Sequence, residues 1–425
     1  MLSQAVIIAG GKGTRLRSII EDKPKILVNL ETETLLDYQI QYLKNNGIKK
    51  IHFCLGYKYK QILQHLKNVD IEFTYSIEDQ PLGTYGALLN AKNFLDETFF
   101  ILYGDVLTNF NIQHGYKSFI NSNSDFHLVL RYTNHPEDSD IVNFNKDNQV
   151  ISISRLRKKE QLVMPIGNTS LLFAKKKAIN EMPEQKASDL FRDYLNNNLK
   201  RLKITGLVSI DYIRDIGTKE RYESEISKYK EKITKPYKVV FMDRDGTLIQ
   251  DQGNENNINK LKFNKLSLEI LKYLQSKNFK VILISNQPGI AKGFFTKEDV
   301  DKFNATIQYK LIENQLEPID DIFICPHHPD KGFKGEVKKL KISCTCRKPN
   351  TGLVENAISR HSLDKGNFLF IGDTLRDYEL SKKINSPFCL IQSNLSESKY
   401  FNQTKVKPIT SLEEFVKKIN KLNFV

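Results

Sequence analysis

Residues 5–16 read AVIIAGGKGTRL, an apolar, β-favouring run that ends in a glycine-rich turn. Residues 237–247, YKVVFMDRDGT, form a similar run that ends in charged residues. Helix-like patterns lie between such runs, for example at 35–47, where Gly47 is placed to end the helix, and at 265–278. Alternating strands and helices predict parallel sheets in α/β layers, whose ligands gather at the carboxyl ends of the strands. The other such runs are FFILY before GDV, VILI before SNQPG, IFI before CPHH and FLFIG before DTLRD.

The composition is that of a globular protein. Of the 425 residues, 40% are hydrophobic and 27% are charged, which excludes a disordered chain. The length favours two or three domains, at roughly 100–200 residues each. No apolar run approaches the ~20 residues that cross a bilayer, so no membrane partner is expected. The N-terminus MLSQAVIIAGGKG shows no basic leader or cleavage site, which predicts a cytoplasmic protein.

The net charge of +14 is spread along the chain, with short basic clusters at 155–159, 175–177 and 338–341. A solvated basic surface and the binding of anionic substrates both explain such a charge. No nucleic-acid-binding motif accompanies it, so we expect no nucleic-acid partner. The oligomeric state cannot be read from the sequence.

Three of the five cysteines lie within 22 residues, beside His327 and His328. In a cytosolic chain this clustering favours a metal site over a disulfide. Cys54 and Cys389 lie in apolar surroundings and are interpreted as core residues.

A charged, helix-like segment runs from 220 to 238, and Pro236 stands just before a new β-rich run. We therefore place a domain boundary near 230–237. The predicted domains are residues 1–232 and 236–425.

The first glycine-rich turn has the residues of a phosphate-binding loop. Glycines allow backbone N–H groups to close around phosphate oxygens, and Arg15 adds a planar charged fork. Taken alone, the turn could equally be a simple link from a strand to a helix. Its residues are Gly10, Gly11, Lys12, Gly13, Thr14 and Arg15, and Lys23-Pro24-Lys25 follows about ten residues later.

Further motifs appear in order: Pro81-Leu82-Gly83-Thr84, Gly104-Asp105 and Asp215-Ile216-Gly217-Thr218. With the first loop they resemble the sugar-1-phosphate nucleotidyltransferase family, over about residues 3–225. The resemblance implies in-line attack of a sugar-1-phosphate oxygen on the α-phosphate of a nucleoside triphosphate, with pyrophosphate leaving. Such a reaction needs positioning and charge neutralisation more than covalent help.

The resemblance also implies roles for individual residues. Asp105 and Asp215 match the Mg²⁺ ligands of the family, and carboxylate oxygens suit that ion. Arg15 and Lys25 match its phosphate clamps. The residues that match nucleotide-binding or sugar-binding positions are Gly10, Gly11, Gly13, Thr14, Gly83 and, more loosely, Asn168. Two departures are Tyr85, where the family has a small residue, and 186–193, where its sugar-side Ser-x-Glu is not clean.

The second half opens with Asp243-Arg244-Asp245-Gly246-Thr247. Two carboxylates two residues apart leave a strand on the same side, so one can attack phosphorus while the other manages the proton. A lone D-x-D is more often a surface turn, but further motifs follow at Ser285-Asn286, Lys348 and Gly372-Asp373 with Asp377. In this order they resemble the haloacid-dehalogenase-like (HAD-like) phosphatases.

This second resemblance implies that Asp243 is the nucleophile and Asp245 the general acid and base. Ser285, Asn286 and Lys348 would contact the phosphate. Asp243, Asp245 and Asp373 would hold Mg²⁺.

Cys325, His327, Cys344 and Cys346 form the pattern C-x-H…C-x-C, a closed Cys₃His set of the kind that holds structural zinc. Buried cysteines or a redox pair are the alternatives. The loop resembles the zinc-bearing subgroup that contains heptose bisphosphate phosphatases and histidinol phosphatases, and the following Arg347 is implied to bind substrate. Departures are Asn254, Glu255 and Thr374, where the heptose enzymes carry other residues.

The expected fold is α/β in two domains, a Rossmann-like, GT-A-like transferase sheet followed by a HAD-like Rossmannoid sheet with a zinc loop. The expected function is removal of the 7-phosphate of a heptose 1,7-bisphosphate, followed by transfer of a nucleotidyl group to heptose 1-phosphate. GTP is expected as the donor by analogy only. Another sugar, CTP, or a regulator without turnover are the alternatives, and Mg²⁺ and Zn²⁺ are the expected cofactors.

Overall fold

The structure of the chain is a computed structural model that describes residues 1–155, 162–184, 188–234, 237–253, 255–364, 366–392, 401, 404, 406–422 and 424. Most of the basic cluster at 155–159 lies outside these residues, as do Pro236, Asn254 and part of the segment 186–193. The chain forms two compact units, the first mainly from residues before 235 and the second mainly from residues after 236. No helix in the described part is both long and apolar enough to cross a membrane.

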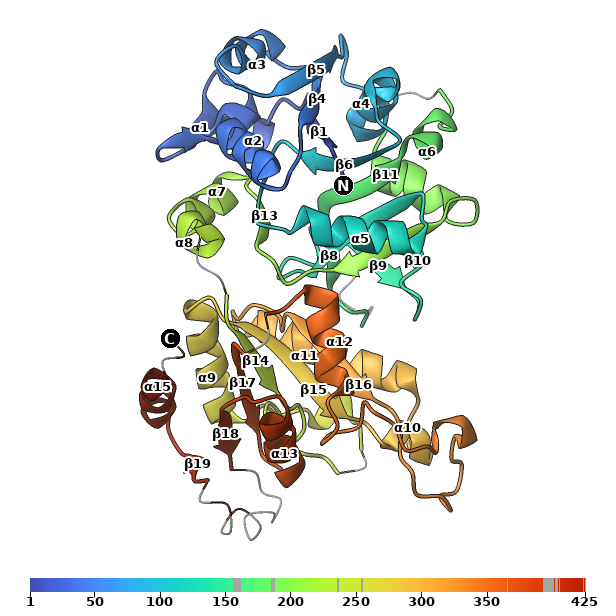
Figure 1. Cartoon of the computed structure of the whole chain (residues 1–425), viewed down its shortest axis with the longest axis vertical. Coiled ribbons are helices and arrows are strands. Elements are labelled where there is room, and N and C mark those ends of the chain that lie inside the picture. Colours follow the sequence, from blue (N-terminus) through green and yellow to red (C-terminus); the bar gives the residue numbers. More distant parts are fainter. Residues whose placement is uncertain are drawn as a thin grey trace. The chain divides into compact units, whose positions relative to one another are not determined.

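The first unit is built on a nine-stranded mixed sheet (Figure 1). β1 (Gln4–Ala9) lies parallel to β4 (Lys50–Leu55) and to β6 (Thr98–Tyr103), and β11 (Ile166–Lys175) pairs antiparallel with β6. The expectation of a parallel sheet therefore needs correction for this half. The described residues between β8 and β11 contain no helix, and short links join antiparallel strands. The other strands are β5 (Glu72–Ile77), β8 (Phe126–Tyr132), β9 (Asp140–Phe144), β10 (Val150–Arg155) and β12 (Ile204–Val208). The pairs among β5, β4, β1 and β6 are parallel, the pairs among β6, β11, β9 and β10 are antiparallel, and β12 lies parallel to β8.

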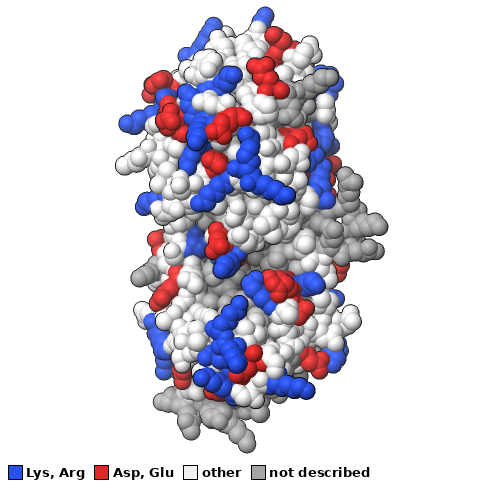
Figure 2. Space-filling model, turned by 90° about the vertical axis from the view of Figure 1, so that its right-hand side faces the viewer, with Lys and Arg blue, Asp and Glu red and all other residues white. Residues whose placement is uncertain are grey.

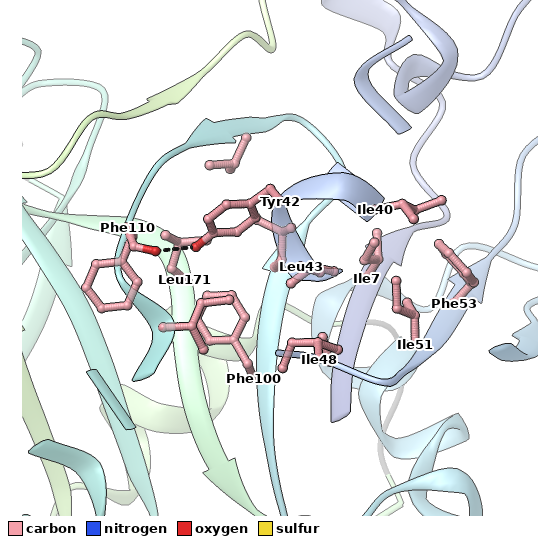
Figure 3. Packing of buried hydrophobic residues seen from close by; sticks show 14 of the residues in the cluster. Ile7, Ile40, Tyr42, Leu43, Ile48, Ile51, Phe53, Phe100, Phe110 and Leu171 are labelled. Atoms are coloured by element: carbon pink, nitrogen blue, oxygen red, sulfur yellow. Dashed lines mark hydrogen bonds between the residues drawn. The ribbon is translucent and has the colours of Figure 1, made fainter. Parts of the chain in front are cut away.

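One hydrophobic core of this unit lies between the sheet and α2 (Leu35–Asn45) (Figure 3). Ile7 and Phe53 point from the sheet into this core, while Ile40 and Leu43 meet them from the helix. The Tyr42 hydroxyl is buried there and donates to the Phe110 carbonyl at 2.8 Å. The other helices are α1 (Arg17–Ile20), α3 (Tyr59–Leu66), α4 (Gly83–Asn90), α5 (Ile112–Ser122), α6 (Lys176–Asn180), α7 (Lys219–Ile226) and α8 (Tyr229–Thr234).

The first predicted helix begins and ends where its capping residues indicate. The Thr34 and Asp37 side chains form a capping box at its start. Gly47 has φ +81°, and the Ile48 N–H donates to the Leu43 carbonyl at 3.1 Å, which closes the helix end. The charged segment at 220–238, in contrast, is divided between the two short helices α7 and α8.

The second unit contains a six-stranded parallel sheet in the order β16-β15-β14-β17-β18-β19, as expected for a HAD-like fold. Its central strand β14 (Val239–Met242) is buried along its whole length, as both faces of the sheet are covered by helices (Figure 1). The other strands are β15 (Lys280–Asn286), β16 (Asp321–Cys325), β17 (Phe368–Gly372), β18 (Phe388–Ile391) and β19 (Pro408–Ile409). The helices are α9 (Lys265–Ser276), α10 (Gly289–Lys292), α11 (Lys297–Glu313), α12 (Gly352–His361), α13 (Leu375–Lys383) and α15 (Leu412–Lys421).

Basic side chains are distributed rather than gathered on the face drawn in Figure 2, where acidic residues lie among them. This arrangement fits the interpretation of the net charge of +14 as a solvated surface. A continuous basic stripe, the usual footprint of a nucleic-acid-binding face, is not visible in that view.

A buried histidine makes the stability of the first unit dependent on pH. His52 lies in β4, with Nδ1 2.8 Å from Thr74 Oγ1 and Nε2 3.1 Å from Ser76 Oγ. Burial lowers the pKa of His52 from 6.5 to about 4. The unfolded chain therefore takes up this proton at a higher pH than the folded chain does. The contribution of neutral His52 to the free energy of unfolding is complete above about pH 6.5 and is lost as the pH falls towards 4.

We expect the free energy of unfolding of the first unit to fall by about 3 kcal/mol across this range through His52 alone. Urea unfolding of the full chain, followed by circular dichroism between pH 7.5 and 4.5, measures the change. His52→Gln should flatten the dependence, whereas His135→Gln, at an exposed position, should leave it unchanged. Equal slopes for wild type and His52→Gln would contradict this assignment.

Candidate active sites and metal centre

The first candidate site lies where β1 ends, in a pocket of about 250 Å³. Gly13 has φ +60°, a conformation that glycine adopts without strain, and η1 (Thr14–Leu16) starts directly after it. The structure therefore brings most of the predicted loop residues to one pocket. Its lining includes Gly11, Gly13, Thr14, Arg15, Lys25, Thr84, Tyr103, Gly104, Asp105 and Gly217.

Two predicted glycines lie beside this pocket instead of lining it. A Cβ atom on Gly10 would stand 1.8 Å from Glu78 Oε1, so a larger residue there would have to displace the Glu78 carboxylate. Gly83 has φ +70°, and a Cβ atom on it would stand 2.3 Å from the Ser188 carbonyl oxygen. Asn168, in β11, is also outside the lining, and its Oδ1 accepts from the Ser170 N–H at 3.0 Å.

The two predicted carboxylates of this half meet because β7 (Val106–Thr108) and β13 (Ile213–Asp215) pair antiparallel. A Cβ atom on Gly217 would lie 2.7 Å from Lys25 Nζ, 3.2 Å from Asp215 Oδ1 and 3.3 Å from Asp105 Oδ2. These three groups therefore surround Gly217. Hard carboxylate oxygens on two sides of one glycine suit a divalent cation such as Mg²⁺.

Each of these carboxylates also has a cationic neighbour. Lys25 Nζ donates to Asp105 Oδ2 at 2.5 Å. Arg221 Nη1 donates to both oxygens of Asp215, at 2.9 and 3.0 Å. Sequence reasoning missed Arg221 and, in the lining, Tyr103, because neither belongs to a motif that marks a metal or phosphate site. Thr84 lies in the motif at 81–84, but the sequence analysis gave it no role.

The unusual Tyr85 does not enter the pocket. Its side chain is fully buried, its hydroxyl donates to the Pro183 carbonyl at 2.5 Å, and its ring packs at 5.0 Å on that of Tyr194. The hydrophobic core that packs against α4 therefore accommodates Tyr85 in place of a small residue.

The second candidate site lies at the carboxyl end of β14, in a pocket of about 160 Å³. Asp243 is 7% exposed and Lys348 is 3% exposed, and Lys348 Nζ lies 2.7 Å from Asp243 Oδ1. The same Nζ lies 2.7 Å from Asp377 Oδ1. Lys348 is held by Asn286, whose side chain accepts from its N–H at 2.9 Å and donates to its carbonyl at 3.1 Å.

Asp243, Asp373 and Asp377 form a buried group whose carboxylate oxygens lie within 4.8 Å of one another. Burial raises the pKa of Asp243, and Asp377 raises it further, while Lys348 acts in the opposite direction. A divalent cation would favour the charged carboxylates, so this group fits Mg²⁺. Gly246 has φ +81°, and a Cβ atom there would stand 2.1 Å from Asp373 Oδ2, which explains the glycine of this motif.

Asp245 lies outside this group, and its roles as metal ligand and as acid and base remain predictions. Its carboxylate pairs with the Arg244 guanidinium, at 3.0 Å from Nη2. Ser285 Oγ and Gln287 Nε2 also donate to Asp245 Oδ2, at 3.2 and 2.7 Å. Sequence reasoning missed Arg244 and Gln287 as neighbours of this carboxylate, since it considered only the motif carboxylates, Ser285 and Asn286.

The metal centre consists of Cys325, at the end of β16, with His327, Cys344 and Cys346. The Cys346 Sγ lies 3.2 Å from Cys325 Sγ, 3.4 Å from Cys344 Sγ and 3.2 Å from His327 Nδ1. A tetrahedral zinc site with Zn–S distances of about 2.3 Å has ligand–ligand edges of about 3.8 Å, so the ligand atoms need to move apart by only a few tenths of an ångström to surround the ion. The hydrogen-bonding contact with Cys325 lowers the pKa of Cys346, which favours the thiolate that a metal needs.

The neighbouring histidine is directed elsewhere. His328 Nδ1 accepts from the Asp330 N–H at 3.3 Å, and its ring packs edge-on against Phe333. Cys54 and Cys389 are buried, as expected for core residues, and burial raises the pKa of Cys54 to about 12.

Comparison with known proteins separates the chain into the same two parts. Residues 4–232 match the family model of nucleotidyl transferases, and residues 238–407 match that of polynucleotide kinase 3 phosphatases. D-glycero-alpha-D-manno-heptose 1-phosphate guanylyltransferase of Campylobacter jejuni is 33% identical over 222 residues, which are 52% of this chain and 96% of that protein.

Two curated relatives match the second part. A probable D-glycero-D-manno-heptose-1,7-bisphosphate 7-phosphatase of Thermoplasma acidophilum is 33% identical over 155 residues, 36% of this chain and 89% of that protein. The D-glycero-beta-D-manno-heptose-1,7-bisphosphate 7-phosphatase of Haemophilus ducreyi is 35% identical over 140 residues, 33% of this chain and 74% of that protein.

Proposed function

The chain belongs to the nucleotidyl transferase family through residues 4–232 and to the heptose-1,7-bisphosphate 7-phosphatases through its second half, and on this premise we propose that it performs two consecutive reactions on one sugar. The second half hydrolyses the 7-phosphate of D-glycero-D-manno-heptose 1,7-bisphosphate. The first half transfers a guanylyl group from GTP to the resulting heptose 1-phosphate and releases pyrophosphate. The domains are residues 1–232 and 236–425.

The presence of both pockets in one chain carries this proposal. A phosphatase that removes the phosphate at one end of a sugar bisphosphate leaves the 1-phosphate in place. A sugar-1-phosphate is the nucleophile that a nucleotidyltransferase of this family consumes. The α-anomer is the proposed substrate, since the guanylyltransferase relative is named for it.

In the phosphatase half, Asp243 attacks phosphorus from the floor of the pocket and forms an aspartyl phosphate. Lys348, in contact with Asp243, neutralises the phosphate oxygens. Asp245 protonates the leaving alcohol and then activates water, and its contacts with Arg244 and Gln287 orient it. Asp373 with Asp243 and Asp245 would hold Mg²⁺, which when bound supplies further charge neutralisation; Asp377 also lies close enough to contribute.

In the transferase half, the N–H groups of the loop at Gly11 and Gly13 bind the triphosphate. Arg15 and Lys25 neutralise the charge that develops as pyrophosphate leaves. Asp105 and Asp215 would hold Mg²⁺, which when bound polarises the α-phosphate. We assign GTP as the donor from the name of the relative, and CTP and other nucleotides remain alternatives.

The assay that tests the proposal offers α-heptose 1,7-bisphosphate with each nucleoside triphosphate in turn and measures phosphate and pyrophosphate separately. We expect phosphate release without any nucleotide, and pyrophosphate release with GTP and not with CTP, UTP or ATP. EDTA should stop both reactions until Mg²⁺ is restored.

Different outcomes separate the alternatives. Pyrophosphate release that requires CTP would correct the nucleotide. Activity with a hexose derivative and none with heptose would correct the sugar. Binding of nucleotide sugar without release of either product would indicate a regulator.

A further inference from the structure

The two carboxylates of the transferase site are already engaged by cations. Lys25 Nζ lies 2.5 Å from Asp105 Oδ2, and Arg221 Nη1 donates to both oxygens of Asp215, at 2.9 and 3.0 Å. A divalent cation would need the same carboxylates, since Asp105 Oδ2 and Asp215 Oδ1 both lie beside Gly217. A metal ion at this site therefore competes with a lysine and an arginine for the same oxygens.

Arg221 is held beside Asp215 by the start of α7. Thr218 caps this helix, and its Oγ1 accepts from the Arg221 N–H at 3.3 Å. The Arg221 side chain is 22% exposed, while that of Asp215 is 42% exposed, so the guanidinium is the more buried partner. An ion pair between two exposed, mobile side chains contributes little. Here the cap fixes the backbone and partial burial restricts the guanidinium, so its position on Asp215 is part of the fold.

The guanidinium of Arg221 has a second acidic partner. Its Nη2 donates at 3.3 Å to Oδ2 of Asp138, which lies in the link between β8 and β9. A guanidinium carries five N–H donors, so it can keep one carboxylate while it gives up another. Asp215 can therefore turn an oxygen to a metal ion without leaving Arg221 unpaired.

The charges of the site favour a metal ion that arrives with its nucleotide. Each of the two carboxylates is matched by one positive charge a few ångströms away. A free divalent cation gains little from such pairs, because the lysine and the arginine repel it. A nucleoside triphosphate adds several negative charges at the neighbouring phosphate loop, and these offset the repulsion.

We propose that Arg221 sets the metal affinity of the transferase site, so that a divalent cation is held there tightly only together with a nucleoside triphosphate. This inference rests on the proposed transferase function. It makes Arg221 a positioning residue that acts through Asp215, with Asp138 as its second anchor.

Mn²⁺ is the probe, because it shares the preference of Mg²⁺ for carboxylate oxygens and is counted by electron paramagnetic resonance. Its binding is measured by equilibrium dialysis of the full chain. The parent chain and all variants carry Asp373→Asn, which removes one carboxylate of the phosphatase group, so that the remaining binding reports on the transferase site.

Without nucleotide, Arg221→Gln should lower the Kd for Mn²⁺ by about tenfold relative to the parent chain, since it removes a positive charge beside Asp215. The parent chain should reach such tight binding only with a non-hydrolysable GTP analogue. Arg221→Met removes the same charge and keeps an unbranched stem, so it should act alike and decides the matter if Arg221→Gln does not fold. A merely structural role of Arg221 would weaken Mn²⁺ binding or leave it unchanged.

Lys219→Gln is the matched control. It removes an exposed positive charge, paired with Glu223 at 3.7 Å, from the same turn of α7 and should leave the Kd unchanged. Adding Asp105→Asn to Arg221→Gln should abolish the gain. The inference is overturned by a Kd that does not fall in the folded Arg221 variants, by an equal gain in Lys219→Gln, by a gain that survives Asp105→Asn, or by tight binding to the parent chain without nucleotide.

Failure of the proposed function would look different. In that case no nucleoside triphosphate would release pyrophosphate with heptose 1-phosphate. Mn²⁺ binding without nucleotide does not depend on turnover, so the comparison of the parent chain with Arg221→Gln decides the inference in either case.

Discussion

Replacing Asp243 with asparagine should lower phosphate release from heptose bisphosphate by about a thousandfold or more, while guanylyl transfer to supplied heptose 1-phosphate continues at the wild-type rate. Asparagine keeps the shape of the side chain but removes the oxygen nucleophile that the reaction requires. Lys348 keeps Asp377 as its partner at 2.7 Å, so the variant does not leave an unpaired buried charge. Coupled assays of phosphate and pyrophosphate on the same preparation measure both effects.

Asp105→Asn is the matched variant in the other half. The substitution removes the negative charge of Asp105 beside Lys25. We therefore expect this variant to lose pyrophosphate release and to keep phosphate release. Circular dichroism melting of both variants checks that they remain folded. If either folded variant lost both activities together, the two sites could not be the independent centres proposed here.

Cys344→Ser should remove the bound metal and lower the thermal stability of the second unit by about 10 °C. Wild-type protein prepared without chelators should contain about one zinc per chain, because three thiolates and one imidazole fill all four positions of a structural site. In a unit of this size, a shift of about 10 °C corresponds to a loss of about 4 kcal/mol in the free energy of unfolding. The first unit should melt as in the wild type.

The same variant should weaken binding of the phosphorylated substrate, since Cys346 directly precedes Arg347 and Lys348. Cys389→Ala is the control: it removes a buried thiol of the same unit that lies outside the metal centre, and should keep the zinc. Elemental analysis and calorimetry decide the matter. If wild-type protein prepared without chelators contains no zinc and is still fully stable, the structural role of the metal centre is refuted.

Much of both sites could be predicted from the sequence because each motif is local. A buried strand followed at once by Asp243 or by the loop at Gly10 must deliver these residues to the carboxyl edge of its sheet. The spacing of Cys325, His327, Cys344 and Cys346 likewise predicts a metal centre, and the four ligand atoms do converge. The α/β class with two Rossmann-like units is confirmed by the fold and by the family matches.

Other features depend on which strands become neighbours, and local patterns do not contain that information. The antiparallel pairs of the first sheet are one case, because the links between β8 and β11, whose described residues contain no helix, could have led to several pairings. The group of Asp243, Asp373 and Asp377 is another, since it forms where β14 and β17 lie side by side.

The amino-acid sequence establishes which chemical groups are available at each strand end: carboxylates, a phosphate loop, a lysine and a set of thiolates. The pairing of these groups follows from the folded structure. It places Asp245 against Arg244 and Gln287, and it packs Tyr85 into the core. The physical reason is that ion pairing and burial depend on distances of a few ångströms between residues far apart in the chain, and these distances are set by packing of the whole unit.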